Sequence, residues 1–271
     1  MKTAYQPKHP IGTLEKAIEI LTYLKDHAFS DGVSIGSISD GTGIGKSGVH
    51  RYLDTLLEYD YVSKNENGTK YRLSWGAYEL GCNIPKMNGV DSRGISEQLH
   101  SLCNEIGYIV NLGIESEQHM MIIKRFFPER PNRKHMLITD VSIGVREPLH
   151  CTGIGKLFLA AMDEREALSI FEAEPEKNKA LTKYTLRDEE TLLQEIKKIR
   201  ECGYAFDRME ASEEVFCVAA PIFDCSGCLV SGISISVPSA YAAKENMESL
   251  GETMKRAARE ISKSMGWNPK L

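Results

Sequence analysis

The stretch GKSGVHRYLDTLLE, residues 45–58, decides the fold of the first part of this chain. Val49, Leu53, Leu56 and Leu57 recur within it at helical spacing and predict a buried stripe on a helix at about 46–59. A tight turn at Thr42-Gly43 precedes it, and weaker helical patterns lie at about 13–27 and 35–41. The segment 46–59 is therefore the third of three consecutive predicted helices.

A hairpin follows these helices. Residues 61–64 and 70–73 have the composition of short strands, and the turn between them contains Asn67-Gly68, a strong hairpin signal. Three helices followed by a hairpin form the pattern of a winged helix-turn-helix domain, which we assign to residues 1–74.

Polar side chains gather on the exposed edge of the third helix and on the hairpin. Arg51 has the shape to bind guanine through two hydrogen bonds, and Ser47 with the free N–H groups of the helix suits a phosphate. The first 75 residues carry nine basic and nine acidic side chains, so a DNA surface must arise from their arrangement. A solvated helix face remains the alternative interpretation. The residues predicted to contact DNA are Lys46, Ser47, His50, Arg51, Lys64, Lys70 and Arg72.

Composition limits the class of protein. The 271 residues are 42% hydrophobic and 26% charged, with a net charge of −5, which is typical of a globular chain and argues against indiscriminate polyanion binding. The sequence has no apolar run long enough for a membrane span and no signal core near Met1, so we expect a cytoplasmic protein without membrane contact. Seven cysteines, an odd number, favour reduced thiols.

The remainder of the chain predicts a linker and a larger domain. Trp75 to Pro85 is expected to be a helix that ends at the proline, within a linker at 75–90. Residues 91–271 alternate strand pairs with helices, which predicts an α+β domain with a mostly antiparallel sheet. The expected strands are 108–115, 119–127, 203–207, 214–223 and 228–237, with one more within 128–150; the expected helices are 95–106, 153–162, 163–173, 188–201 and a long closing helix.

Three motifs suggest other functions and fail their tests. Residues 43–47 resemble a phosphate loop, but Asp40 stands where the first glycine is required; residues 153–156 fail on spacing. Cys225 and Cys228 lack two further ligands at zinc spacing. The sequence shows no nucleophile–base set, so a small-molecule enzyme with a helical accessory domain is only the alternative. We expect no cofactor and no metal.

Several motifs in the order they have here resemble the IclR family of bacterial regulators. They are residues 148–156 (PLHCTGIGK), 203–207 (GYAFD), 217–224 (CVAAPIFD), 232–236 (GISIS) and, in the first domain, 50–56 (HRYLDTL). The resemblance implies a winged helix-turn-helix domain, a linker helix, a GAF-like effector domain, and dimers often paired into tetramers on an operator. The end of the chain is most similar to the branch that senses 2-keto-3-deoxygluconate and related sugar acids.

The resemblance also implies an effector pocket. Its residues here would be Gly153, Ile154, Asp207, Cys217, Ser234 and Ser236. Backbone N–H groups at the start of the helix at 153–162 attract a carboxylate, and two serines spaced by two residues on a strand face the same side. Asp207 would accept hydrogen bonds from hydroxyls at the far end of the ligand. Ordinary structural roles remain the alternative for the serines, Cys217 and Asp207.

The expected function is therefore a DNA-binding regulator, a repressor by default, that responds to a small organic acid. One position departs from the family pattern. Gly48 stands where relatives often have a threonine, which removes a hydroxyl from the first turn of the recognition helix and costs roughly 1 kcal/mol of helix propensity.

Overall fold

The computed structural model describes residues 8–27, 31–87, 93–129, 143–175 and 180–268. The chain divides into two compact units, Met1–Gly89 and Val90–Leu271, and each is described by itself. The boundary falls within the linker that the sequence predicts at 75–90.

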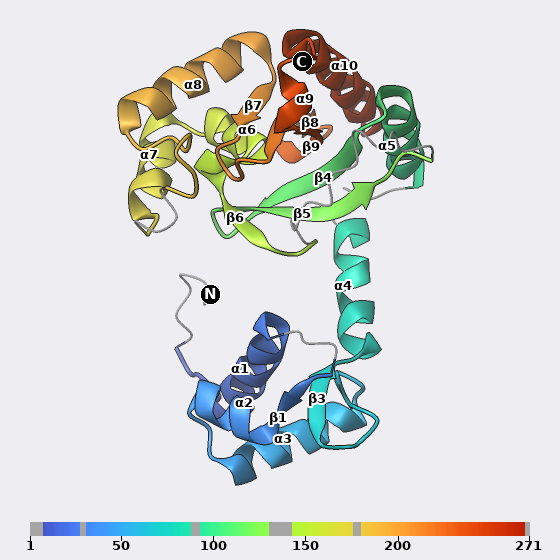
Figure 1. The fold of residues 1–271 in the computed structure, drawn as a ribbon, viewed down its shortest axis with the longest axis vertical. Helices are drawn as coiled ribbons and strands as arrows, with labels where there is room; N and C mark the ends of the chain where they lie inside the picture. Colours follow the sequence, from blue (N-terminus) through green and yellow to red (C-terminus); the bar gives the residue numbers. More distant parts are fainter. Residues whose placement is uncertain (1–7, 28–30, 88–92, 130–142, 176–179, 269–271) are drawn as a thin grey trace. The chain divides into compact units, whose positions relative to one another are not determined.

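The first unit is a winged helix-turn-helix, and the predicted architecture is confirmed. Its helices are α1 (Gly12–Asp26), α2 (Ile35–Thr42) and α3 (Lys46–Glu58), followed by the wing strands β2 (Val62–Lys64) and β3 (Lys70–Leu73) (Figure 1). A two-residue strand, β1 (Val33–Ser34), adds a third member in the order β1-β3-β2, which the sequence did not predict. The predicted buried stripe on α3 is only partly confirmed. Val49 and Leu53 are fully buried, whereas Leu56 and Leu57 are half-buried.

Tertiary contacts stabilise α2, whose own helix propensity is weak. Ser34 caps its first turn by accepting a hydrogen bond from the Ser37 N–H at 3.1 Å, and Ile38 is fully buried. Gly41 allows close contact with α1, because a Cβ there would lie 2.0 Å from the ring of Tyr23. The glycine that weakens the helix is thus the residue that lets it pack.

The helix that follows the wing is longer than predicted. We expected it to end at Pro85, but α4 runs from Trp75 to Met87. A proline removes one backbone donor, the one directed at the carbonyl four residues earlier. Near the end of a helix this loss affects a single hydrogen bond, so α4 continues for two more residues.

The second unit is built on one antiparallel sheet, which confirms the predicted α+β class. The strand order is β6-β5-β4-β9-β8-β7. The strands are β4 (Ile109–Ser116), β5 (His119–Phe126), β6 (Arg146–Pro148), β7 (Ala205–Arg208), β8 (Val215–Phe223) and β9 (Leu229–Pro238). The helices are α5 (Arg93–Ile106), α6 (Gly153–Ala161), α7 (Glu164–Ala173), α8 (Glu189–Cys202), α9 (Ser239–Ala242) and α10 (Met247–Ser264), with a 3-10 turn at Leu149–Cys151. The short α9 and the 3-10 turn were not predicted.

The two faces of this sheet differ in the size of their side chains. Helices α5 and α10 cover one face, where Ile233, Ile235 and Val237 of β9 join a dense apolar core (Figure 1). Helix α6 covers the other face, toward which Ser234 and Ser236 point from the same strand. Large side chains on one face and small ones on the other leave space beneath α6.

Candidate DNA-binding surface and ligand pocket

The four residues predicted on the recognition helix lie together on an exposed edge of α3. Lys46, Ser47, His50 and Arg51 are all exposed and belong to its first two turns. His50 is held along the helix by Asp54, with Nδ1 2.9 Å from Oδ2. No side chain caps the start of α3 at Gly45, within the part of the chain that the structure describes, so the first N–H groups are available to a phosphate.

The three wing residues differ in their surroundings. Lys64 is exposed, with its ammonium 5.4 Å from the centre of the Tyr71 ring. Arg72 is exposed and its Nε lies 3.4 Å from Ser63 Oγ. Lys70 is half-buried and forms an ion pair with Asp31. Lys70 must therefore release Asp31 before it can reach DNA.

The packing of the turn between α2 and α3 explains why position 48 is a glycine. A Cβ at this position would lie 3.2 Å from Ile44 Cγ2, a side chain that is buried in the turn between α2 and α3. A larger residue would push against this turn, so glycine suits the packing even though it supplies no hydroxyl for a phosphate.

All six residues predicted for the effector site line one pocket in the second unit. The cavity has a volume of about 60 Å³, between the start of α6 and strands β4, β5, β8 and β9. A single water requires about 10–15 Å³ by the same measure, so the space corresponds to a small molecule. The pocket is lined by Gly153, Ile154, Asp207, Cys217, Ser234 and Ser236, together with Asn111, Met120, Ile122, Arg125, Glu147, Thr152, Ala211, Ser212 and Val215.

The start of α6 contributes backbone donors to this pocket. Thr152 is its N-cap residue, and its hydroxyl oxygen accepts a hydrogen bond from the Gly155 N–H at 3.0 Å. Gly153 and Ile154 line the cavity at the first two positions of the helix. The positive end of the helix therefore faces the cavity, where it favours an anion.

The sequence prediction missed several polar residues of the pocket, among them Asn111 and Arg125. Asn111 is buried on β4, directly opposite Ser234 of β9 and Arg125 of β5. Its amide nitrogen lies 3.3 Å from Ser234 Oγ and 3.1 Å from Ser236 Oγ. Alternation along 109–115 could have indicated Asn111, because it is the only amide on a strand of otherwise apolar character.

Arg125 reaches the pocket through a β-bulge. Leu112 pairs with Lys124 and Gly113 pairs with Ile122, so Ile123 is an extra residue in β5. Lys124 consequently points to the opposite face, where its ammonium bonds Ser96 of α5 at 2.8 Å. Simple alternation would place Arg125 on that opposite face, and so it could not be predicted.

Asp207 is a carboxyl group in unusual surroundings. It is buried, and its Oδ1 accepts a hydrogen bond from the Glu210 N–H at 2.7 Å. Burial, reinforced by the nearby charge of Glu210, raises the pKa of Asp207 to about 7. The expected repulsion between Asp207 and a bound carboxylate is therefore reduced near neutral pH.

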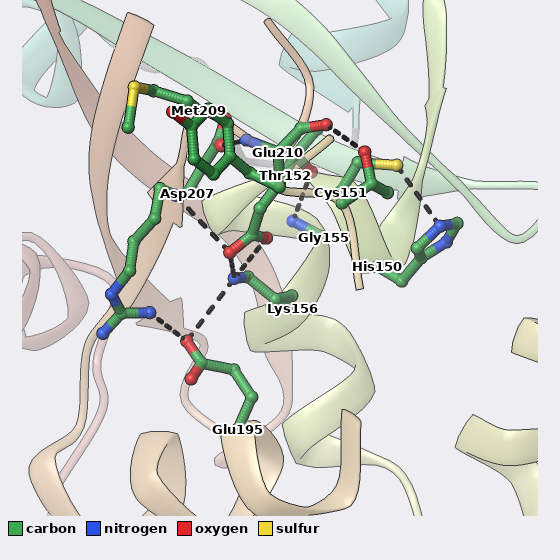
Figure 2. Close-up of polar contacts among 12 residues, drawn as sticks. His150, Cys151, Thr152, Gly155, Lys156, Glu195, Asp207, Met209 and Glu210 are labelled. Carbon is green, nitrogen blue, oxygen red and sulfur yellow. Dashed lines mark hydrogen bonds and ion pairs between the residues drawn. The ribbon is translucent and has the colours of Figure 1, made fainter. Parts of the chain in front are cut away.

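A buried ion network lies behind the pocket (Figure 2). Lys156 of α6 is 0% exposed, and its ammonium lies 2.6 Å from Glu210 Oε2 and 3.4 Å from Glu195 Oε1 of α8. Arg208 bonds the same Glu195 oxygen at 2.8 Å. The lysine of the sequence GIGK thus stabilises the segment that carries Asp207.

The cysteines form no disulfide and no metal site among the described residues. All seven are free thiols, and burial raises the pKa of Cys217, the thiol in the pocket. Cys225 and Cys228 are exposed in the turn between β8 and β9. Groups of three or more side chains able to hold a metal do not occur in the described parts of the chain. Nor is any described helix long and apolar enough to cross a membrane.

A winged helix-turn-helix with an exposed recognition edge, joined in one chain to an α+β unit with a small pocket, defines a ligand-responsive transcriptional regulator. Family profiles agree: the IclR helix-turn-helix domain matches residues 13–66, and the bacterial transcriptional regulator IclR C-terminal domain matches residues 92–263. The chain belongs to the IclR family of bacterial transcriptional regulators.

Full-length relatives have similar sequences. The chain is 31% identical over 237 residues to the HTH-type transcriptional regulator KdgR of Escherichia coli, covering 87% of both chains. It is 30% identical over 253 residues to the HTH-type transcriptional repressor AllR of the same species, covering 93% of this chain and 90% of the relative. The crystal structure of Thermotoga maritima IclR superposes with a TM-score of 0.73 at 27% identity, covering 94% of this chain and 99% of that one.

Proposed function

We propose that this regulator represses transcription by binding an operator through α3 and the wing, and that a small carboxylic acid in the pocket of the second unit changes operator affinity. The observation that carries the ligand part is the convergence of the α6 N-terminus with Ser234 and Ser236 on one small cavity. A coupling of about 1–3 kcal/mol would change operator affinity about 5–150-fold. Repression is supported by the AllR relative, which is named a repressor.

The pocket supports a small, partly hydroxylated acid. Helix N–H groups and two hydroxyls are donors for a carboxylate, while Asp207 and Glu147 offer acceptors to ligand hydroxyls elsewhere in the lining. The similarity to KdgR favours a sugar acid such as 2-keto-3-deoxygluconate as the first ligand to test. We expect no enzymatic reaction, because burial keeps the Cys217 thiol protonated and the relatives of this protein are regulators.

Exposed apolar side chains support a homodimer. Ile11, Leu14 and Ile18 lie one or two turns apart at the start of the chain's first helix and are 64%, 56% and 52% exposed. On α4, Trp75 and Tyr78 are exposed and form an edge-to-face pair. Surfaces of this kind commonly mark an interface. A dimer would place two α3 helices in successive major grooves, about 34 Å apart, on a near-palindromic operator inside the cell.

Footprinting of the DNA upstream of the protein's own operon tests the proposal. We expect the wild-type chain to protect a near-palindromic site and to release it, or bind it more tightly, when 2-keto-3-deoxygluconate or another small carboxylate is added. Arg51→Ala should remove the specific footprint while ligand binding remains. Arg93→Ala, the same change on the exposed side of α5, is the matched control and should leave the footprint intact. A footprint unchanged in Arg51→Ala would remove α3 from the proposed interface.

A further inference from the structure

Four polar side chains form a continuous hydrogen-bonded row across the sheet beneath α6. Arg125 of β5 donates from Nε to Asn111 Oδ1 at 2.9 Å. Asn111 of β4 lies 3.3 Å from Ser234 Oγ and 3.1 Å from Ser236 Oγ through its Nδ2 atom. These residues are direct cross-strand neighbours on the pocket face, apart from Ser236, which lies two residues farther along β9.

The chemistry of arginine sets the direction of every hydrogen bond in this row. A guanidinium N–H can only donate, so the Asn111 atom that it contacts must be the carbonyl oxygen. The NH₂ group of Asn111 then faces the serines and donates to both. Each serine oxygen is thereby an acceptor from Asn111, which leaves its own O–H proton to point elsewhere.

The O–H protons of the two serines can be donated to a ligand in the pocket. Ser234 and Ser236 both line the cavity, beside the first N–H groups of α6. Among the described residues, Ser236 Oγ also lies 3.9 Å from the Cys217 sulfur, which is a weak acceptor. The pocket therefore offers two hydroxyl donors and a helix N-terminus at one place, and a carboxylate accepts from all of them.

We propose that Asn111, oriented by Arg125, is the positioning residue that makes this pocket select a carboxylate over its uncharged amide. The inference rests on the proposed function and adds the origin of its ligand specificity. A primary amide brings two donors of its own, which would meet the serine protons instead of acceptors. A site built of oriented donors discriminates strongly against such a ligand because buried groups are left unpaired.

The main test is Asn111→Asp, which keeps the shape of the side chain and reverses its hydrogen bonding. A carboxylate at this position only accepts, so both serine protons turn away from the ligand toward residue 111. Titration calorimetry would use pyruvate, gluconate, 2-keto-3-deoxygluconate and 4-hydroxybenzoate, with pyruvamide, gluconamide and 4-hydroxybenzamide as the amides. We expect the ratio of acid affinity to amide affinity to fall at least about tenfold. Asn104→Asp on α5, outside the pocket, is the matched control and should leave the ratio unchanged.

Three further variants separate hydrogen-bond direction from charge. Asn111→Leu is neutral and close in size, and it should also lower the ratio because the serine protons lose their fixed orientation. Arg125→Met releases the amide to flip and should have the same effect. Arg125→Gln loses the same positive charge as Arg125→Met but retains a donor toward Asn111, so its preference for the acid should exceed that of Arg125→Met.

A measurement without ligand tests the row directly. In protein labelled with ¹⁵N-arginine, the Arg125 Nε–H resonance should exchange slowly with solvent, and Asn111→Leu should make it exchange at least about tenfold faster. An unchanged acid-to-amide ratio in Asn111→Asp and Arg125→Met, with acids still bound by the wild type, overturns this inference alone. Wild-type protein that binds none of the acids overturns both the inference and the proposed ligand class.

Discussion

Replacing Lys156 by methionine isolates the energetic role of the buried ion network. Methionine fills a similar volume without charge, so the change removes the partner of Glu210 while the packing of α6 is largely retained. Glu195 keeps Arg208 as a partner at 2.8 Å, whereas Lys156 is the ion-pair partner of the buried Glu210. The expected loss therefore comes mainly from one carboxylate.

The expected loss in the free energy of unfolding can be calculated in two ways. Removing one partner of a buried ion pair costs about 3–5 kcal/mol. Alternatively, Glu210 can become protonated, and protonating a carboxyl with an ordinary pKa of 4.5 at pH 7 costs about 3.4 kcal/mol, or 2.5 units at 1.36 kcal/mol each. Both estimates give a destabilisation of about 3–4 kcal/mol for the second unit at pH 7.

The pH dependence has a definite sign. Without Lys156, burial leaves the pKa of Glu210 further above its unfolded value, so the folded state binds the proton more tightly. The free energy of unfolding of Lys156→Met should therefore fall more steeply than that of the wild type as pH rises above about 4.5. Urea unfolding followed by circular dichroism at pH 5 and pH 7 measures both values.

A second substitution provides the control. Lys156→Met combined with Glu210→Gln removes both charges and should recover most of the lost stability, because no unpaired charge remains. A loss below about 1 kcal/mol in Lys156→Met, or a double variant no more stable than the single one, would refute the role assigned to this network.

Three shorter predictions concern binding and assembly. Replacing both Ser234 and Ser236 by alanine should weaken carboxylate binding about 10–100-fold in calorimetry, with operator affinity in the absence of ligand unchanged. The dissociation constant of a carboxylate should rise as pH increases through about 7, because Asp207 loses its proton there, and Asp207→Asn should flatten this dependence. Leu14→Asp should shift the protein toward monomer in sedimentation experiments and weaken operator binding, since half-sites would then be bound singly; an unchanged mass would exclude the α1 face from the interface.

Periodicity and turn chemistry were sufficient to predict most elements. The spacing of Val49 and Leu53 located the recognition helix, and Asn67-Gly68 located the wing. The two-residue β1 and the four-residue α9 were missed because so few side chains form no pattern in these two segments. The sequence predicts that α4 ends at Pro85, because it does not show how few hydrogen bonds lie beyond this residue; the helix in fact ends at Met87.

Regular strand alternation explains the placement of the two serines, whereas the other predicted pocket residues came from the family resemblance. Ser234 and Ser236 share a face of β9, as their spacing requires. Arg125 was missed because the bulge at Ile123 reverses the alternation, and a bulge depends on how two strands pair. Lys156 was recognised as part of a motif, but its burial depends on Glu195 and Glu210, which follow it by 39 and 54 positions in the chain.

The unequal faces of the main sheet bear on how such a regulator can change its ligand over evolutionary time. Because consecutive strand residues point in opposite directions, a substitution at Ser234 leaves Ile233 and Ile235 in their places among α5 and α10. Ligand recognition and core packing thus depend on alternate residues of the same strand. Substitutions of the pocket-facing residues can change the ligand specificity, while the core-facing residues continue to specify an unchanged scaffold.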